Sequence, residues 1–140
     1  MNPVNLPGGE HAVLLIHGLQ SSPAEMQPLA KQLNQAGYSV HAPHIKGYGY
    51  EHGDDAYSIT HWKDWHAKVL NEFYLLRQQY KSVAVSGLCI GAVLALSIAA
   101  ELGDEVAALS LLSTTLYYDG WSIPWYRFLL PIGYYTPFRY

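Results

Sequence analysis

The segment of this sequence whose residue types and spacing could carry chemistry is Gly87-Leu88-Cys89-Ile90-Gly91. A glycine stands two residues before and two residues after the cysteine, a pattern typical of a sharp strand-to-helix turn that exposes a nucleophile. Glycines are needed there because the two backbones come close together. The following helix favours the thiolate form of Cys89, which is the nucleophilic form. The segment predicts acyl chemistry at Cys89; the alternative is a small buried apolar residue.

A second motif, His17-Gly18-Leu19, directly follows an apolar run. We expect the backbone N–H groups of Leu19 and Ile90 to form an oxyanion hole, which stabilises the negative charge of a tetrahedral intermediate. His17 is expected to be a structural hydrogen-bonding residue and not the general base, because it lies on the strand that shapes this hole.

A third group of residues, all histidines and aspartates, could form a metal site instead of taking part in acyl chemistry. His41, His44 and His52 lie near Asp54 and Asp55 in the sequence and could act as ligands. Their irregular spacing across a glycine-containing loop matches none of the common zinc patterns. We therefore expect no metal ion at these residues.

Buried strands and amphipathic helices must position these motifs. Apolar runs rich in branched residues alternate with segments of helical periodicity, which predicts an α/β fold with a mostly parallel sheet. The expected strands are His11–Ile16, Tyr38–Ala42, Ser82–Ser86 and Val106–Leu112, and the expected helices are Pro23–Ala36, Thr60–Tyr80 and Ile90–Leu102.

Two of the expected helices carry additional signals. Ser22 and Glu25 have the spacing of a capping box, with Pro23 at the first helical position. In the second helix, Trp62 and Trp65 fall on the same side as later apolar residues. We expect that side to pack against the sheet.

The composition is that of one globular domain. The chain has 140 residues, of which 50% are hydrophobic and 14% charged, and its net charge is −3. This weak charge argues against nucleic acid or anionic lipid as a partner. The single cysteine and the absence of a signal-peptide pattern indicate a reducing, cytoplasmic setting, and no apolar run is long enough to span a membrane.

These motifs, with the Gly47-Tyr48-Gly49 loop between them, resemble the carboxylesterase and serine aminopeptidase S33 type of α/β-hydrolase over about residues 10–115. The resemblance implies a three-layer α/β/α sandwich, with the N-terminal half of the fold in residues 1–116 and the start of a cap in residues 117–140. It also implies hydrolysis of small acyl substrates, which are esters, thioesters or amides, without any cofactor. Ordinary packing or contact with a membrane surface are alternative roles for the aromatic 117–140 segment.

The chain departs from this family pattern at the nucleophile and after it. A cysteine replaces the usual serine, as in polyhydroxyalkanoate synthases and dienelactone hydrolases, so acyl transfer is an alternative reaction and a non-catalytic binding remnant another. The family's acid and histidine follow the nucleophile. No histidine follows His66 in this chain, and Asp119 is a candidate acid.

The fourth expected strand gives a further reason to think that the fold is incomplete. Val106–Leu112 has the composition of a strand buried on both faces, yet no later strand is predicted to cover its outer edge. An exposed apolar edge favours aggregation. We therefore expect a fragment or one half of a split hydrolase, with weak or no turnover unless a C-terminal half is supplied in trans.

Overall fold

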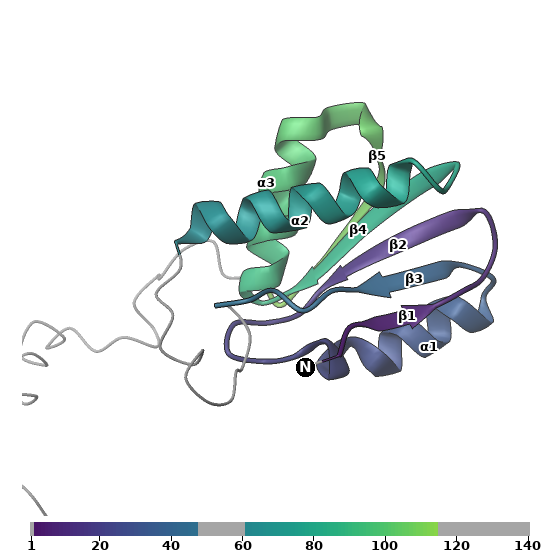
Figure 1. Ribbon diagram of the computed structural model, residues 1–140, viewed down its shortest axis with the longest axis horizontal. Helices are drawn as coiled ribbons and strands as arrows, with labels where there is room; N and C mark the ends of the chain where they lie inside the picture. Colours follow the sequence, from purple (N-terminus) through teal and green to yellow (C-terminus); the bar gives the residue numbers. More distant parts are fainter. Residues whose placement is uncertain (1, 48–60, 115–140) are drawn as a thin grey trace, which may run out of the picture.

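The computed structural model describes residues 2–47 and 61–114, which form a five-stranded sheet with helices on both faces (Figure 1). The strand order is β1-β3-β2-β4-β5. Strand β1 runs antiparallel to β3, and all other neighbouring pairs are parallel. This agrees with the predicted mostly parallel sheet. The strands are β1 (Val4–Leu6), β2 (His11–Ile16), β3 (Ser39–Ala42), β4 (Ser82–Leu88) and β5 (Val106–Leu112).

The helices divide between the two faces of the sheet. Helix α1 (Gln27–Gln35) covers one face, and α2 (Trp62–Arg77) and α3 (Ile90–Leu102) cover the other (Figure 1). Two short 3₁₀ turns, η1 (Pro23–Met26) and η3 (Gly103–Glu105), precede α1 and follow α3. None of the helices in the described ranges has the length and apolar character needed to cross a bilayer.

Strand β2 lies at the centre of two hydrophobic cores. Successive side chains of a strand point to opposite faces. Leu14 therefore packs with Phe73 and the rest of the α2 and α3 side, whereas Leu15 packs with Met26 and the α1 side. Both leucines are fully buried. The prediction that His11–Ile16 is a strand buried on both faces is confirmed, apart from the exposed His11 at its start.

The N-terminal strand β1 was not expected from the sequence. It has only three residues, and its middle residue is Asn5, so it shows no clear apolar alternation. Its place is set by pairing, since Leu6 lies opposite Val40 of β3. Pairing between distant segments leaves little trace in so short a sequence.

The predicted capping box before α1 is wrong. Ser22 makes no side-chain cap hydrogen bond, and the first turn is a 3₁₀ turn. The carboxylate of Glu25 instead accepts a hydrogen bond from the N–H of Gly18. Glu25 therefore binds the N–H of Gly18, just after β2, and not the backbone of Ser22 as a capping box requires.

The prediction for the apolar side of α2 holds except at its start. Val69, Phe73 and Leu76 are buried, and Trp65 packs against the same core. Trp62, the first helical residue, is 55% exposed and so does not pack against the sheet as expected. The helix begins beyond the area that the sheet covers.

The expectation that β5 is buried on both faces is also wrong for this structure. Within the described residues β5 pairs only with β4, at the edge of the sheet. Leu109 and Leu111 are 38% and 37% exposed. The apolar composition of the strand shows what it is suited to contact, whereas its burial depends on which segments lie beside it.

Candidate active site

Cys89 occupies the sharp turn between β4 and α3. Its backbone has φ 57° and ψ −119°, a conformation that residues other than glycine rarely adopt. The N–H of Cys89 donates to the carbonyl of Leu112, which ties the turn to the end of β5 at 2.9 Å. The cysteine is exposed. A strained, exposed turn at the carboxyl end of a parallel strand is the geometry that the GxCxG pattern predicts.

The two glycines of the pattern are required by close backbone contacts. A Cβ atom added to Gly87 would lie 2.1 Å from the carbonyl oxygen of Gly91. One added to Gly91 would lie 2.5 Å from the carbonyl oxygens of both Ile16 and His17. Any side chain at either position would force the backbones apart. The same contacts bring the start of α3 against the end of β2.

The second motif therefore lies next to the first. Gly18 is buried, and a Cβ atom on it would be 3.8 Å from the Cβ of Cys89. Leu19 is 46% exposed, and Gln20 has a positive φ of 55°. The segment after β2 thus bends sharply beside the cysteine.

Polar groups hold the peptide bonds on both sides of Gly18. The carbonyl oxygen of Gly18 is 2.9 Å from Nδ1 of His17 and accepts a second hydrogen bond from the N–H of Ser21 at 3.3 Å. The N–H of Gly18 donates to Oε2 of Glu25 at 2.9 Å. A carbonyl only accepts, so Nδ1 of His17 carries the hydrogen.

His17 is fully buried, and its ring stacks on that of His44 at 6.0 Å between centroids. Burial lowers the pKa of His17, and the neighbouring His44 lowers it further. The hydrogen bond to Gly18 and the charge of Glu25 oppose this shift without reversing it. The imidazole is therefore neutral at neutral pH, with Nδ1 committed to the backbone.

Glu25 binds the backbone of Gly18, a role that the sequence pattern did not predict. The spacing from Ser22 favoured a helix cap, whereas its carboxylate lies on the backbone of Gly18. One signal could have pointed to this contact. Glu25 is the only acidic residue between Glu10 and Glu51, so no other nearby carboxylate could bind the backbone after β2.

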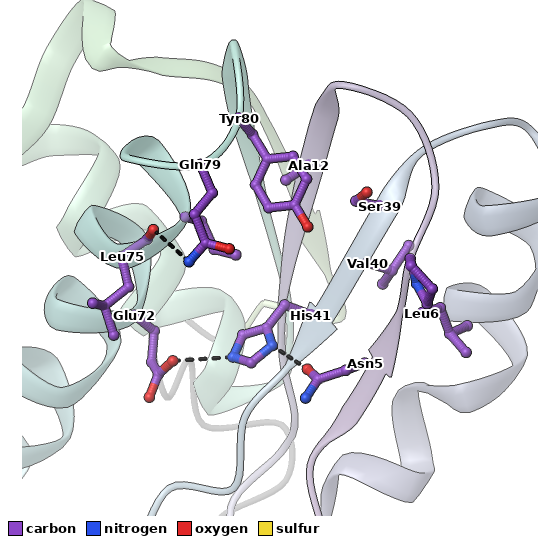
Figure 2. A pocket seen from close by; sticks show the side chains of 12 residues that line it. Asn5, Leu6, Ala12, Ser39, Val40, His41, Glu72, Leu75, Gln79 and Tyr80 are labelled. Carbon is purple, nitrogen blue, oxygen red and sulfur yellow. Dashed lines mark hydrogen bonds and ion pairs between the residues drawn. The ribbon is translucent and has the colours of Figure 1, made fainter.

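The histidines considered as metal ligands separate in the structure. His41 lies on β3 and contacts Asn5 and Glu72, the latter at 3.0 Å (Figure 2). His44 instead stacks on His17. Among the residues that the structure describes, no three His, Cys, Asp or Glu side chains are grouped to hold a metal ion. His52, Asp54, Asp55 and Asp119 lie outside the described residues, as does the 117–140 segment.

His41 also lines a cavity of about 320 Å³ between α2 and the β1–β3 edge of the sheet (Figure 2). Ala12 and Ser39, near the amino ends of β2 and β3, form part of its wall. Cys89 follows the carboxyl end of β4. The cavity and the cysteine therefore lie at opposite ends of the parallel strands.

Comparisons with known proteins agree with the fold and with the family resemblance. The family model of the serine aminopeptidases, S33, matches residues 9–134. The chain is similar to a carboxylesterase of Bacillus subtilis (strain 168), at 35% identity over 99 residues, which are 69% of this chain and 39% of the esterase. It is similar to a thermostable monoacylglycerol lipase of Bacillus sp. (strain H-257), at 36% identity over 102 residues, which are 73% of this chain and 40% of the lipase. The chain thus spans about two fifths of the length of these curated relatives.

Solved structures share the fold at lower identity. The monoacylglycerol lipase of Paleococcus ferrophilus matches with a TM-score of 0.73 at 21% identity, over 97% of this chain and 52% of the lipase. A chain from a study of the metagenome-derived lipolytic enzymes LipS and LipT matches with a TM-score of 0.75 at 24% identity, over 84% of this chain and 47% of that chain. Since the family match covers most of the sequence and the fold is the one these structures share, the chain belongs to the serine aminopeptidase S33 family of α/β-hydrolases.

Proposed function

We propose that this chain supplies the nucleophile and the oxyanion hole of an acyl hydrolase that acts on small carboxylic esters or thioesters. The observation that carries the proposal is the strained, exposed turn at Cys89, packed against the segment that follows β2. Holding a cysteine in such a backbone conformation lowers the stability of the fold. Strain of this kind is concentrated at functional sites, where it is part of the mechanism. The carboxylesterase and the monoacylglycerol lipase among its relatives support an ester as the substrate.

In the proposed reaction, the thiolate of Cys89 attacks the carbonyl carbon of the substrate. The carbonyl π electrons move to the oxygen, and the N–H groups of Leu19 and Ile90 stabilise the resulting oxyanion. Collapse of this intermediate breaks the bond to the alcohol or thiol, which leaves as an anion and takes from water the proton that the thiol of Cys89 had released to it. Water then attacks the S-acyl cysteine, releasing the carboxylic acid and restoring the thiol.

We assign the general base of the second step to a histidine outside this sequence. No histidine follows His66, and the buried His17 uses Nδ1 to bind Gly18. A C-terminal half, on a longer chain or in trans, would bring the base, and Asp119 is a candidate acid. Because a thiol can attack a reactive ester without an adjacent base, whereas water needs a base to attack the S-acyl cysteine, the 140-residue chain should form an acyl-enzyme and turn over slowly.

The test is intact-mass analysis of the 140-residue chain after incubation with p-nitrophenyl acetate. The expected result is a single acetyl adduct on the wild type and none on Cys89→Ala. Cys89→Ser is the matched variant, because a serine hydroxyl needs a base to become nucleophilic whereas a thiol does not. We expect it to acylate at least about 100-fold more slowly, as general-base catalysis is typically worth about 10²–10⁴.

Two outcomes would overturn the proposal. If Cys89→Ala formed as much acetyl adduct as the wild type, the nucleophile would be a residue other than Cys89. A folded wild-type chain that forms no adduct, although Cys89 is free to react with iodoacetamide, would show that the turn lacks a working oxyanion hole.

A further inference from the structure

We propose that Glu25 is a positioning residue for the oxyanion hole: its carboxylate holds the peptide of Gly18, and so aims the N–H of Leu19 at the site beside Cys89. The inference rests on the proposed function, since it assigns a task to a residue next to that site. Its starting point is the 2.9 Å hydrogen bond from the N–H of Gly18 to Oε2 of Glu25. A capping box would have sent this carboxylate to the backbone of Ser22.

The location of this contact is the first argument. A Cβ atom added to Gly18 would lie 3.3 Å from Oε2 of Glu25 and 3.8 Å from the Cβ of Cys89. The carboxylate and the cysteine therefore both lie close to the same point beside Gly18. A change in how Glu25 holds Gly18 must alter the backbone next to the nucleophile.

The geometry of the peptide bond is the second argument. The C=O of Gly18 and the N–H of Leu19 belong to one planar, trans peptide and point in opposite directions. Fixing the C=O therefore fixes the N–H. His17 and Ser21 hold the carbonyl side, and Glu25 holds the preceding N–H of Gly18. Because both the N–H and the C=O of Gly18 are hydrogen-bonded, its two backbone dihedral angles, φ and ψ, have little freedom left.

The exposure of the residue after Gly18 is the third argument. Gly18 has no side chain to restrict its backbone, Leu19 is 46% exposed, and Gln20 has a φ of 55°. The hydrogen bonds of Gly18 therefore help to hold the conformation of this segment. A hydrogen bond to a charged carboxylate is among the stronger anchors available to a backbone N–H.

The charge of Glu25 strengthens its hydrogen bond to Gly18, but the role itself requires only an acceptor oxygen. A negative charge near the oxyanion and the thiolate opposes both, so only the acceptor oxygen helps the reaction. Glu25→Gln keeps an acceptor without the charge, whereas Glu25→Met keeps the length without an acceptor. Glu25 is exposed, so neither change removes a buried side chain from the core.

The experiment compares two reactions of Cys89 in the 140-residue chain. Acylation by p-nitrophenyl acetate passes through an oxyanion, whereas alkylation by iodoacetamide does not. We expect Glu25→Met to slow acylation about tenfold, less than the roughly 10²–10³ for losing an oxyanion donor itself. Its alkylation rate should stay within about twofold of wild type, and the ratio of the two rates in Glu25→Gln should match wild type.

The outcomes separate the two proposals. If the wild type is not acylated, or Cys89→Ala is, the proposed function fails. If the wild type is acylated but Glu25→Met has the same ratio of acylation to alkylation, only the role of Glu25 fails. An equal fall in both rates also overturns that role, because it would reflect access to the thiol. Glu25→Asp, with its carboxylate one methylene shorter, should lower the ratio less than Met, and it decides the matter if Glu25→Met does not fold.

Discussion

At the scale of single residues, strain is concentrated at Cys89. A non-glycine residue with φ 57° and ψ −119° carries about 1–3 kcal/mol of backbone strain. The turn is nevertheless held in place, because the N–H of Cys89 bonds to Leu112 and the flanking glycines allow close backbone contact. The stability of the surrounding sheet therefore maintains a conformation that the residue itself disfavours.

This strain makes a prediction about Cys89→Gly. Glycine adopts this backbone conformation without steric penalty, so the variant should be more stable than the wild type by about 1 kcal/mol, although it loses the nucleophile. The measurement is the urea midpoint of unfolding. Cys89→Ala is the matched control, since it removes the thiol but retains the Cβ and the strain. If Cys89→Gly is no more stable than Cys89→Ala, the turn is not strained.

At the scale of elements, one carboxylate, that of Glu72, links helix α2 to strand β3, next to the edge strand β1. Glu72 of α2 lies 3.0 Å from Nε2 of His41 on β3 and 2.7 Å from Nζ of Lys68, one turn earlier in the helix. Figure 2 shows the contact between Glu72 and His41. Burial tends to raise the pKa of Glu72, but its bonds to Lys68 and His41 outweigh burial and lower the pKa below the ordinary value. The carboxylate therefore stays charged between the two elements.

This shift predicts acid sensitivity. Because the pKa of Glu72 is lower in the folded than in the unfolded state, the pair stabilises the fold above the ordinary pKa of about 4.5. That stabilisation is lost as the pH falls through 4.5 towards the folded value. Glu72→Gln should lower the free energy of unfolding at pH 7 by about 1–3 kcal/mol and remove part of its decline at acid pH.

The control for Glu72→Gln is Glu101→Gln. Glu101 is 3.4 Å from His66, but its side chain is 53% exposed, so its loss should change stability by less than about 1 kcal/mol. Urea unfolding of both variants between pH 3 and pH 7 makes the comparison. Equal effects of the two substitutions would show that the Glu72 pair does not anchor α2.

At the scale of the whole molecule, the main feature is the edge of the sheet at β5, which no strand in residues 2–47 or 61–114 covers. Within the described residues β5 pairs only with β4, and its leucines at 109, 111 and 112 are 36–38% exposed. Strand edges with apolar side chains pair with other chains unless something blocks them. Self-association of the 140-residue chain is the expected consequence.

A charge on this edge should reduce that association. Leu111→Lys should raise the monomer fraction severalfold at micromolar concentration, because a lysine on an edge strand opposes pairing with a second chain. Light scattering coupled to size-exclusion chromatography measures it. Leu75→Lys is the control, since Leu75 is 44% exposed but lies on α2. If both substitutions act alike, general solubility and not the β5 edge controls association.

The sequence by itself determined the order of the main elements and the form of the turn at Cys89. Strands β2, β4 and β5 and helix α3 lie where the apolar patterns predict them, with β4 extending two residues further. Local signals suffice here, because the periodicity of a buried strand or helix follows from its own geometry. The glycines of the GxCxG pattern are similarly informative, since only glycine fits the contacts at Gly87 and Gly91.

Only the tertiary structure decided which groups meet and which surfaces are covered. The partner of Glu25, the pairing of the short strand β1 and the exposure of Trp62 all depend on segments distant in the sequence or on the extent of the sheet. The same holds for β5, whose apolar residues predict burial that no described segment provides. A side chain's type limits what it can contact, but the packing of the chain selects the contact that it makes.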